Sequence, residues 1–325
     1  MSAEHDSSFH AMGSEIRLLI GPALVASARS PEAAALRERA YVEDFAARLS
    51  RFRADSELCA LNADLRARVP ASPLLRAAVS AALWAAERSG GLIDPTLLGA
   101  LERAGYERTR DGERPEPLAA ALARAPARRP AAPDPAARWR TVAVDEGAGV
   151  VIRPAGVRID TGGTGKGLCA DAVAHRLRRY SRFVVDCGGD LAIGGVGAQL
   201  DPYEVEIEHP LSGETIRSIR VGAGGVASSG LNVNVWSGAD GTPRHHLIDP
   251  ATGEPAWTGV AGATALGPTA LEAETLAKMA LLLGPAGARD VLALHGGLIV
   301  HDDGDVEEIG PLGEPVGVLA PGFAA

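Results

Sequence analysis

The amino-acid sequence predicts an α+β fold. Helix-like apolar spacing dominates the first third of the chain, short β-rich segments run through the second half, and few helical segments separate them. Strands in such runs favour an α+β fold over a doubly wound parallel sheet. The chain has 325 residues, of which 46% are hydrophobic. This is enough for one or two packed domains and argues against disorder.

The first part of the chain predicts one strand and two helices. Residues from Phe9 to Ile20 alternate weakly, which indicates a strand. Ser30-Pro31 and Ser72-Pro73 each predict a helix start, because Ser caps a helix and Pro fits its first turn. Gly90-Gly91 ends the second helix. The apolar stripes are Leu36, Val42, Phe45 and Leu49 in the first helix, and Leu74, Leu75, Ala78, Val79, Ala82, Leu83 and Ala86 in the second.

The second half predicts several short strands and two further helices. The helices are expected after Gly167 and after Pro268, where apolar residues recur at helical spacing. The strands are expected at Val157–Asp160, Phe183–Asp186, Tyr203–Ile207, Ile216–Val221 and Leu298–His301.

The stretch from residue 107 to residue 140 has a different composition. Six prolines fall between Pro115 and Pro135, mixed with Ala and Arg. This composition predicts an irregular surface excursion that holds one short helix at Leu118–Leu122. It is either a domain boundary or a long loop inside one domain.

Charge and sorting signals restrict the class of protein. The formal net charge of −9 and the pI of about 5.4 make a nucleic-acid partner unexpected, because such a surface repels phosphates. No signal peptide or apolar run long enough for a membrane span is visible, so a cytoplasmic protein is expected. Cys59, Cys169 and Cys187 fit no metal or disulfide spacing, which predicts buried free thiols.

A glycine-rich turn lies between a predicted strand and a predicted helix. Asp160 to Gly167 reads Asp-Thr-Gly-Gly-Thr-Gly-Lys-Gly. Glycines allow backbone N–H groups to approach a phosphate, the helix start adds partial positive charge, and Lys166 adds a full charge. The spacing matches neither a Walker A loop nor G-x-G-x-x-G. Phosphate binding and simple tight-turn geometry are equally compatible with these residues.

Two turn segments carry further polar side chains. Gly91 to Thr96 places the carboxylate of Asp94 in a turn before a proline, where a turn-forming role is the common one. His245 to Gly253 combines His, Asp and Thr in a strand-to-turn segment. His246 is a candidate general base, and a strand edge followed by an Asp-stabilised turn is the alternative.

The helix expected from Thr269 to Leu283 is apolar on nearly every side, which predicts burial. Glu274 and Lys278 interrupt it and share one face, four residues apart. Such charges need a partner or a ligand in a buried helix. A salt bridge between them at a partly exposed rim is the alternative.

Taken in order, these segments resemble the FAD:protein FMN transferase family of the ApbE type. The resemblance runs from about residue 9 to about residue 310. The matching segments are Phe9–Ser14, Leu49–Glu57 with Leu61-Asn62, Gly91–Thr96, Asp160–Gly167 with Asp171, Asp186–Asp190, Ser228–Gly230, His246–Gly253 and Pro268–Gly284.

The resemblance implies one α+β module, related to the T-fold, with mainly antiparallel sheets and flanking helices over residues 9–310. It implies an enzyme that binds FAD with Mg²⁺, transfers FMN to a Thr or Ser hydroxyl of an acceptor protein of the FMN-binding-domain type, and releases AMP. The positions that correspond to the family's flavin-nucleotide site are Met12, Leu92, Ile93, Asp94, Lys166, Leu168, Asp171, His246 and Leu247.

The same resemblance implies the catalytic and metal positions. His246, Lys166 and Lys278 are the catalytic candidates, and Gly165 matches a position whose carbonyl faces the metal. The family usually has Asp and Thr as metal ligands where this chain has Glu274 and Lys278. Glu can bind Mg²⁺, but Lys cannot while charged. We therefore expect Lys278 to take over part of the role of the metal and to leave one weak Mg²⁺ site.

Two other functions use the same site. A metal-dependent FAD pyrophosphatase would release AMP and FMN to water. A flavin-binding protein without catalysis would bind FAD and leave it intact, which the Lys278 substitution makes credible.

Overall fold

The core of the molecule is an antiparallel sheet of eight strands. The computed structural model describes residues 4–110, 112–113, 115–238 and 240–312. Along the sheet the strands are β1 (His5–Ala11), β2 (Ser14–Ile20), β6 (Phe183–Cys187), β7 (Asp190–Gly194), β10 (Gly224–Gly230), β15 (Val260–Gly267), β16 (Gly297–His301) and β17 (Val306–Ile309). Every neighbouring pair in it is antiparallel, so the α+β expectation is confirmed.

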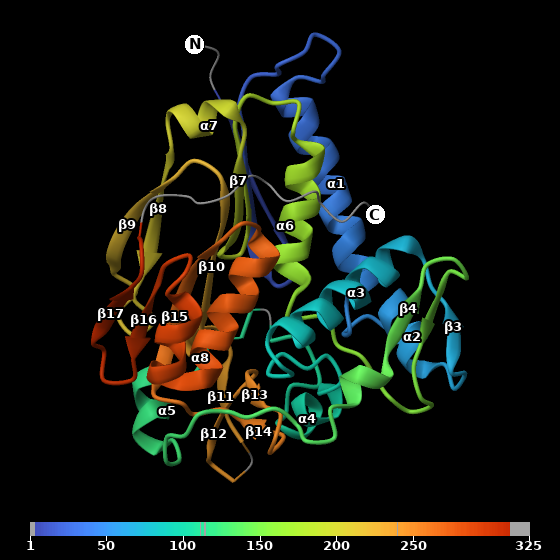
Figure 1. Cartoon of the computed structure of the whole chain (residues 1–325), viewed down its shortest axis with the longest axis vertical. Coiled ribbons are helices and arrows are strands. Elements are labelled where there is room, and N and C mark those ends of the chain that lie inside the picture. Colours follow the sequence, from blue (N-terminus) through green and yellow to red (C-terminus); the bar gives the residue numbers. More distant parts are fainter. Residues whose placement is uncertain (1–3, 111, 114, 239, 313–325) are drawn as a thin grey trace.

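Three helices cover one face of this sheet (Figure 1). Helix α1 (Pro31–Leu49) packs on β1 and β2, α6 (Gly165–Arg176) on β6 and β7, and α8 (Ala270–Leu292) on β10, β15 and β16. The hairpin of β8 (Tyr203–Glu208) and β9 (Thr215–Val221) packs on the other face of the sheet, where its apolar side chains share one buried cluster with side chains of β6, β7, β10, β15 and β16. The order of the helices therefore follows the order of the strands.

Shorter elements surround this framework. On one side of the molecule lie α2 (Glu57–Ala63), α3 (Pro73–Arg88), α4 (Leu98–Arg103) and a three-stranded sheet of β3 (Arg68–Pro70), β5 (Val150–Ile152) and β4 (Ala143–Asp145). The others are α5 (Leu118–Arg124), α7 (Val196–Leu200), the pair β11 (Val235–Ser237) and β12 (Pro243–His245), the pair β13 (Ile248–Asp249) and β14 (Glu254–Pro255), and the 3-10 turns Arg138–Thr141 and Leu231–Val233.

The Ser-Pro helix starts are confirmed in detail. The hydroxyls of Ser30 and Ser72 accept hydrogen bonds from the backbone N–H groups of Ala33 and Leu75, and each is followed by Pro in the first turn. Most of the predicted apolar stripe of α1 is buried. Leu36 is the exception, because its side chain is 65% exposed on the outer face of the helix.

Two strand predictions were wrong. The segment Phe9–Ile20 is not one strand, because it folds back at Met12-Gly13, both with positive φ, to give the β1–β2 hairpin. The described residues 157–160 form no strand. Their polar groups are met elsewhere: the side-chain amide of Asn62 bonds both the N–H and the C=O of Ile159.

The proline-rich stretch is more than a surface excursion. Its short helix forms as predicted, as α5. However, Leu118, Ala121, Leu122 and Ala131 are buried in the same apolar cluster as α8. Their apolar side chains tie the stretch to the core despite the prolines. No helix in the described part of the chain is long and apolar enough to span a bilayer.

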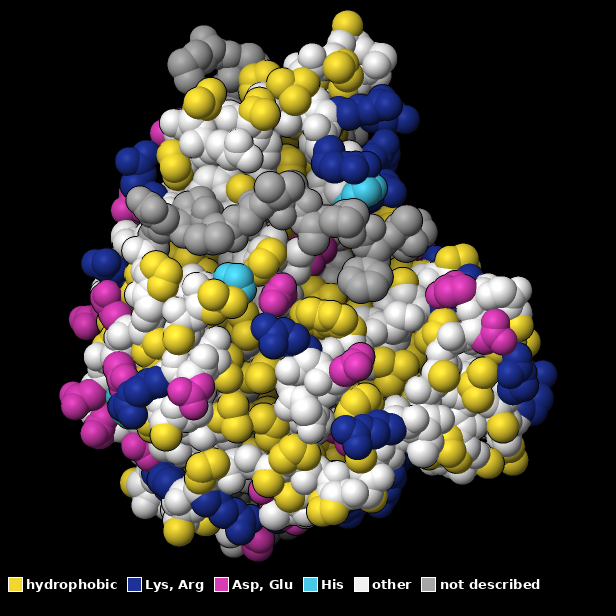
Figure 2. Space-filling view, in the orientation of Figure 1, with side chains coloured by type: hydrophobic (Ala, Val, Ile, Leu, Met, Phe, Trp, Pro, Cys, Tyr) yellow, Lys and Arg dark blue, Asp and Glu magenta, His cyan; other side chains and the backbone are white. Residues whose placement is uncertain are grey.

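Acidic side chains collect along one edge of the molecule. Figure 2 shows acidic side chains along one edge of the face in view. Strands β8 and β17 carry Glu204, Glu206, Glu307 and Glu308. These carboxylates contribute to the formal net charge of −9.

Helices α6 and α8 approach each other very closely at their N-terminal ends. A Cβ atom added at Gly167 would lie 2.8 Å from the backbone oxygen of Ala270 and 2.8 Å from the Cα of Leu271. No other residue type fits there without moving a helix.

We therefore expect Gly167→Ala to destabilise the protein by about 1–3 kcal/mol, the usual cost of overpacking. Denaturant unfolding would measure this loss. Gly147→Ala is the matched control, because its Cβ would meet only the Asp145 side chain at 3.7 Å. Equal stability of the two variants would contradict the close-packing explanation.

Candidate functional site

The glycine-rich turn opens helix α6 and has room above it. None of the glycines at 162, 163, 165 and 167 has a positive φ, so the backbone conformation does not require glycine there. Gly167 is explained by packing against α8. A Cβ at Gly165 would meet no described atom within 4 Å, and one at Gly163 would meet only Ile93, at 3.6 Å. Neither glycine is therefore required by packing against the described residues, and phosphate binding at this turn stays a prediction.

Each of the helices α6 and α8 supplies a carboxylate to backbone N–H groups at the start of the other. Asp171 of α6 accepts hydrogen bonds from the backbone N–H groups of Ala270 and Leu271, at 2.9 and 3.0 Å. In return, Oε2 of Glu274 in α8 accepts one from the N–H of Gly167, at 2.9 Å. Each helix N-terminus is therefore stabilised by a negative charge from the other helix.

Lys166 belongs to a buried ion pair. Its Nζ lies 2.9 Å from Oδ2 of Asp190 and donates to the carbonyl of Gly188, at 3.0 Å. Burial opposes the ammonium charge, but Asp190 and then Glu274 outweigh it and raise the pKa of Lys166. Lys166 is thus charged at neutral pH beside the glycine-rich turn.

Glu274 and Lys278 form the second buried ion pair. Their side chains are 0% and 11% exposed, and Nζ of Lys278 lies 2.7 Å from Oε1 of Glu274. Burial raises the pKa of the Glu274 carboxyl, and the ammonium of Lys278 opposes that rise. The pair was expected either at a ligand site or at an exposed rim, and it is a salt bridge in a buried position.

The expected Mg²⁺ does not fit the donor set well. One oxygen of Glu274 is taken by Lys278 and the other by the N–H of Gly167. Among the described residues, no three His, Cys, Asp or Glu side chains are grouped so that they could hold a metal ion. A divalent ion at Glu274 would share the carboxylate with the ammonium of Lys278, whose Nζ lies 2.7 Å from Oε1 and whose positive charge repels the ion.

His246 lies beside these charges and is neutral. Burial, followed by the positive charges of Lys278 and Lys166, lowers the pKa of its imidazole to about 4. Its Nδ1 is buried and finds no hydrogen-bond partner in the described part of the chain. The neighbouring His245 is different, because it is fully buried against the ring of Trp257, at 4.6 Å. Nε2 of His245 likewise has no partner among the described residues. Proton transfer by His246 stays a prediction.

The apolar positions predicted to line a flavin are mostly buried. Leu168 belongs to the core under α1 and α6, whereas Leu92 and Leu247 belong to the core under α8. Met12 lies at the tip of the β1–β2 hairpin. Their contact with a flavin stays a prediction.

Asp94 and Asp171 have clear structural roles. Oδ1 of Asp94 accepts from the N–H and the hydroxyl of Thr96, as expected for a turn former. Its Oδ2 is buried, has no partner among residues with described positions, and burial raises the pKa of the carboxyl. Both oxygens of Asp171 bond the start of α8. A nucleotide contact by either side chain stays a prediction.

Sequence reasoning missed several residues of this site. Asp190, Arg51 and Tyr106 were not among the candidates, although Arg51 and Asp190 stand in segments that carry the resemblance. The sequence gives no sign that Asp190 pairs with Lys166, because the two residues are far apart in the chain. In the segment His245 to Gly253, the carboxylate of Asp249 accepts from the N–H of Ala251 and the hydroxyl of Thr252. These bonds are those of the Asp-stabilised turn that the sequence offered as one alternative.

A cavity of about 290 Å³ opens next to β11 and contains none of the predicted site residues. Its lining comes from Arg110, Glu113, Pro115, Glu116, Val233, Asn234, Val235, Trp236 and Ser237. The charges that suit a phosphate are at the glycine-rich turn. We therefore place the candidate site at the turn and not in this cavity.

Removing Asp190 should leave a mostly buried ammonium without its partner. We expect Asp190→Asn to destabilise the protein, near the lower end of the range of about 3–5 kcal/mol because Lys166 is partly exposed. Urea unfolding would measure it. The control Asp201→Asn removes an exposed partner of Arg182 and should cost less than about 1 kcal/mol. Similar losses in both variants would contradict the importance of the buried pair.

Three kinds of comparison place this geometry among known proteins. The model of the ApbE family matches residues 12–300. A FAD:protein FMN transferase of Treponema pallidum is 32% identical over 253 residues, which cover 73% of this chain and 67% of that protein. One of Escherichia coli K12 is 31% identical over 142 residues, covering 42% of this chain but only 40% of that protein.

Solved structures share the fold over nearly the whole chain. The ApbE protein of Thermotoga maritima has a TM-score of 0.74 at 23% identity and covers 94% of this chain and 97% of its own. The flavinyl transferase ApbE of Pseudomonas stutzeri has a TM-score of 0.72 at 19% identity, with coverages of 95% and 96%. The family match spans the glycine-rich turn, His246 and the Glu274–Lys278 pair alike. The chain belongs to the ApbE family.

Proposed function

We propose that this chain transfers FMN from FAD to a Thr or Ser hydroxyl of an acceptor protein and releases AMP. The observation that carries the proposal is the neutral imidazole of His246, with an unpartnered Nδ1, beside two ammonium groups at a helix N-terminus. This combination suits attack of a hydroxyl on a phosphate. Relatives named FAD:protein FMN transferase support the same activity.

Different groups of the chain bind the pyrophosphate, neutralise its charge and take up the proton. Backbone N–H groups of the glycine-rich turn and the start of α6 face the pyrophosphate of FAD. Lys166 and Lys278 neutralise its negative charge. Nδ1 of His246 takes the proton of the acceptor hydroxyl, whose oxygen attacks the phosphorus on the flavin side. The bond to the adenosine-side phosphate breaks, and AMP leaves with the electron pair.

We also propose that any Mg²⁺ contribution is weak. A bound Mg²⁺ would neutralise phosphate charge at the oxygen of Glu274 and the carbonyl of Gly165. Lys278 already supplies one positive charge there, 2.7 Å from Glu274. An ammonium cannot impose octahedral geometry, so some dependence on the ion should persist.

The proposed activity and the role of His246 can be tested together. Purified protein, FAD, Mg²⁺ and an acceptor of the FMN-binding-domain type should give an acceptor whose mass has increased by FMN. His246→Gln should keep FAD binding within a few-fold and lower transfer by about 10²-fold or more. Because the pKa of His246 is about 4, activity should be insensitive to this group from roughly pH 5 to 8 and fall only as the pH approaches 4.

The outcomes separate the alternatives. FMN in solution with an unchanged acceptor mass would identify a pyrophosphatase, and tight binding of intact FAD would identify a binding protein. Normal turnover of His246→Gln would remove His246 from the mechanism.

The role of Lys278 is tested by its replacement with the hydroxyl residue usual in the family. Lys278→Thr should free Glu274 for Mg²⁺ and so shift the Mg²⁺ dependence of FAD cleavage to lower concentration. The control Lys278→Met removes the charge without adding an oxygen ligand. It should lower activity without a comparable gain in Mg²⁺ affinity. If the Mg²⁺ curves of Lys278→Thr and wild type coincide, Lys278 lies outside the site.

A further inference from the structure

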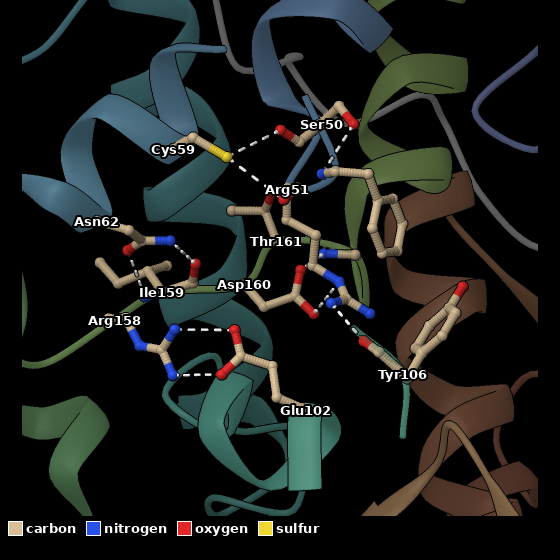
Figure 3. Close-up of polar contacts among 12 residues, drawn as sticks. Ser50, Arg51, Cys59, Asn62, Glu102, Tyr106, Arg158, Ile159, Asp160 and Thr161 are labelled. Atoms are coloured by element: carbon tan, nitrogen blue, oxygen red, sulfur yellow. Dashed lines mark hydrogen bonds and ion pairs between the residues drawn. The ribbon is translucent and has the colours of Figure 1, made fainter. Parts of the chain in front are cut away.

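Arg51 is a buried arginine whose charge is incompletely paired. Its Nη1 donates to the carbonyl of Tyr106, at 2.7 Å, and its guanidinium lies over the rings of Phe52 and Tyr106, 4.1 and 4.4 Å from their centroids. Figure 3 shows the guanidinium between Asp160 and Tyr106. The side chain is only 8% exposed.

The guanidinium lacks a full set of acceptors. Its nearest carboxylate oxygen, Oδ2 of Asp160, is 3.7 Å from Nε, which is too long for a hydrogen bond. Its Nη2 is buried and has no hydrogen-bond partner among the described residues. A buried donor that stays unpaired is costly, and a charged one more so. The unpaired N–H groups therefore point to an acceptor that arrives from outside the chain.

The surroundings of Arg51 join it to the candidate site. Oδ1 of Asp160, the same carboxylate, accepts from the N–H of Gly162 at the start of the glycine-rich turn. The positive charge of Arg51 also contributes to the lowered pKa of His246. The ring of Tyr106 lies edge-on to the imidazole of His246, with 6.3 Å between centroids. Arg51 is thus located between the turn and His246.

The segment that carries Arg51 is held firmly. The thiol of Cys59 donates to the carbonyl of Arg51, at 3.3 Å. Three residues further along, the amide of Asn62 bonds both backbone groups of Ile159, next to Asp160 (Figure 3). These contacts fix the backbone around Arg51, and the carbonyl of Tyr106 holds the guanidinium, which lowers the entropic cost of using it for binding.

We propose that Arg51 binds a phosphoryl oxygen of the flavin nucleotide through Nη2. The inference rests on the proposed function for the identity of the nucleotide. We favour an anion over a neutral carbonyl of the flavin ring as the acceptor. The guanidinium is buried, and its nearest carboxylate, Asp160, is 3.7 Å away. A negative charge compensates the cost of burying the guanidinium better than a neutral oxygen does. A planar guanidinium also matches two phosphate oxygens better than an ammonium does.

Binding of FAD, FMN and riboflavin tests this contact without any transfer step. Riboflavin shares the ring but lacks the phosphate. Arg51→Gln should weaken FAD and FMN about tenfold or more and leave riboflavin within about twofold, since a charge-assisted contact to phosphate is lost. Arg51→Lys keeps the positive charge but lacks the planar set of N–H donors of a guanidinium, so it should give an intermediate loss of FAD and FMN affinity. The control Arg53→Gln removes an exposed guanidinium paired with Asp55 and should change none of the three affinities.

Thermal melting of the unliganded variants shows whether they fold. The FAD-induced rise in melting temperature should shrink in Arg51→Gln and persist in Arg53→Gln. Equal loss of all three ligands would overturn the proposal, because Arg51 would then act through Tyr106 or the flavin ring. Unchanged FAD affinity in both Arg51 variants would overturn it as well. Failure of transfer to any acceptor, with these binding results intact, would contradict the proposed function and not the role of Arg51.

Discussion

The exchange of carboxylates between the N-termini of α6 and α8 is the constraint on which the site depends. Asp171 of α6 bonds the first N–H groups of α8, and Glu274 of α8 bonds the N–H of Gly167 in α6. Gly167 permits this approach, because a Cβ there would collide with the α8 backbone. Since both helices lie on the same sheet, the exchange fixes the glycine-rich turn relative to Lys278.

The same arrangement brings two ion pairs to the glycine-rich turn. The charges of Lys166 and Lys278 are matched by Asp190 and Glu274, so the unliganded site avoids a cluster of unpaired cations. Burial of the imidazole, followed by the charges of Lys278 and Lys166, lowers the pKa of His246 and keeps it neutral. A ligand that brings negative charge would meet ammonium groups whose positions are already fixed by their ion pairs.

Local signals were reliable where the chemistry is local. Ser30 and Ser72 cap their helices as predicted, because a cap involves only neighbouring residues. The prediction failed for residues 157–160, whose backbone bonds the distant side chain of Asn62 instead of a strand. It failed again for Phe9–Ile20, where positive φ at Met12 and Gly13 turns the chain back on itself. The exposed Leu36 also shows that apolar spacing alone does not decide which side chains are buried.

The sequence by itself determined the α+β class, the helix starts and the list of chemical groups: the glycine-rich turn, Lys166, His246, Glu274 and Lys278. It also determined that Glu274 and Lys278 share a helical face, since residues four apart always do. Only the tertiary structure decided which partners these groups have. It paired Lys166 with Asp190, placed Glu274 on the N–H of Gly167, and left Nη2 of Arg51 without an acceptor among the described residues. Such pairings depend on how the strands and helices pack, and hydrophobic periodicity carries no information about contacts between segments far apart in the chain.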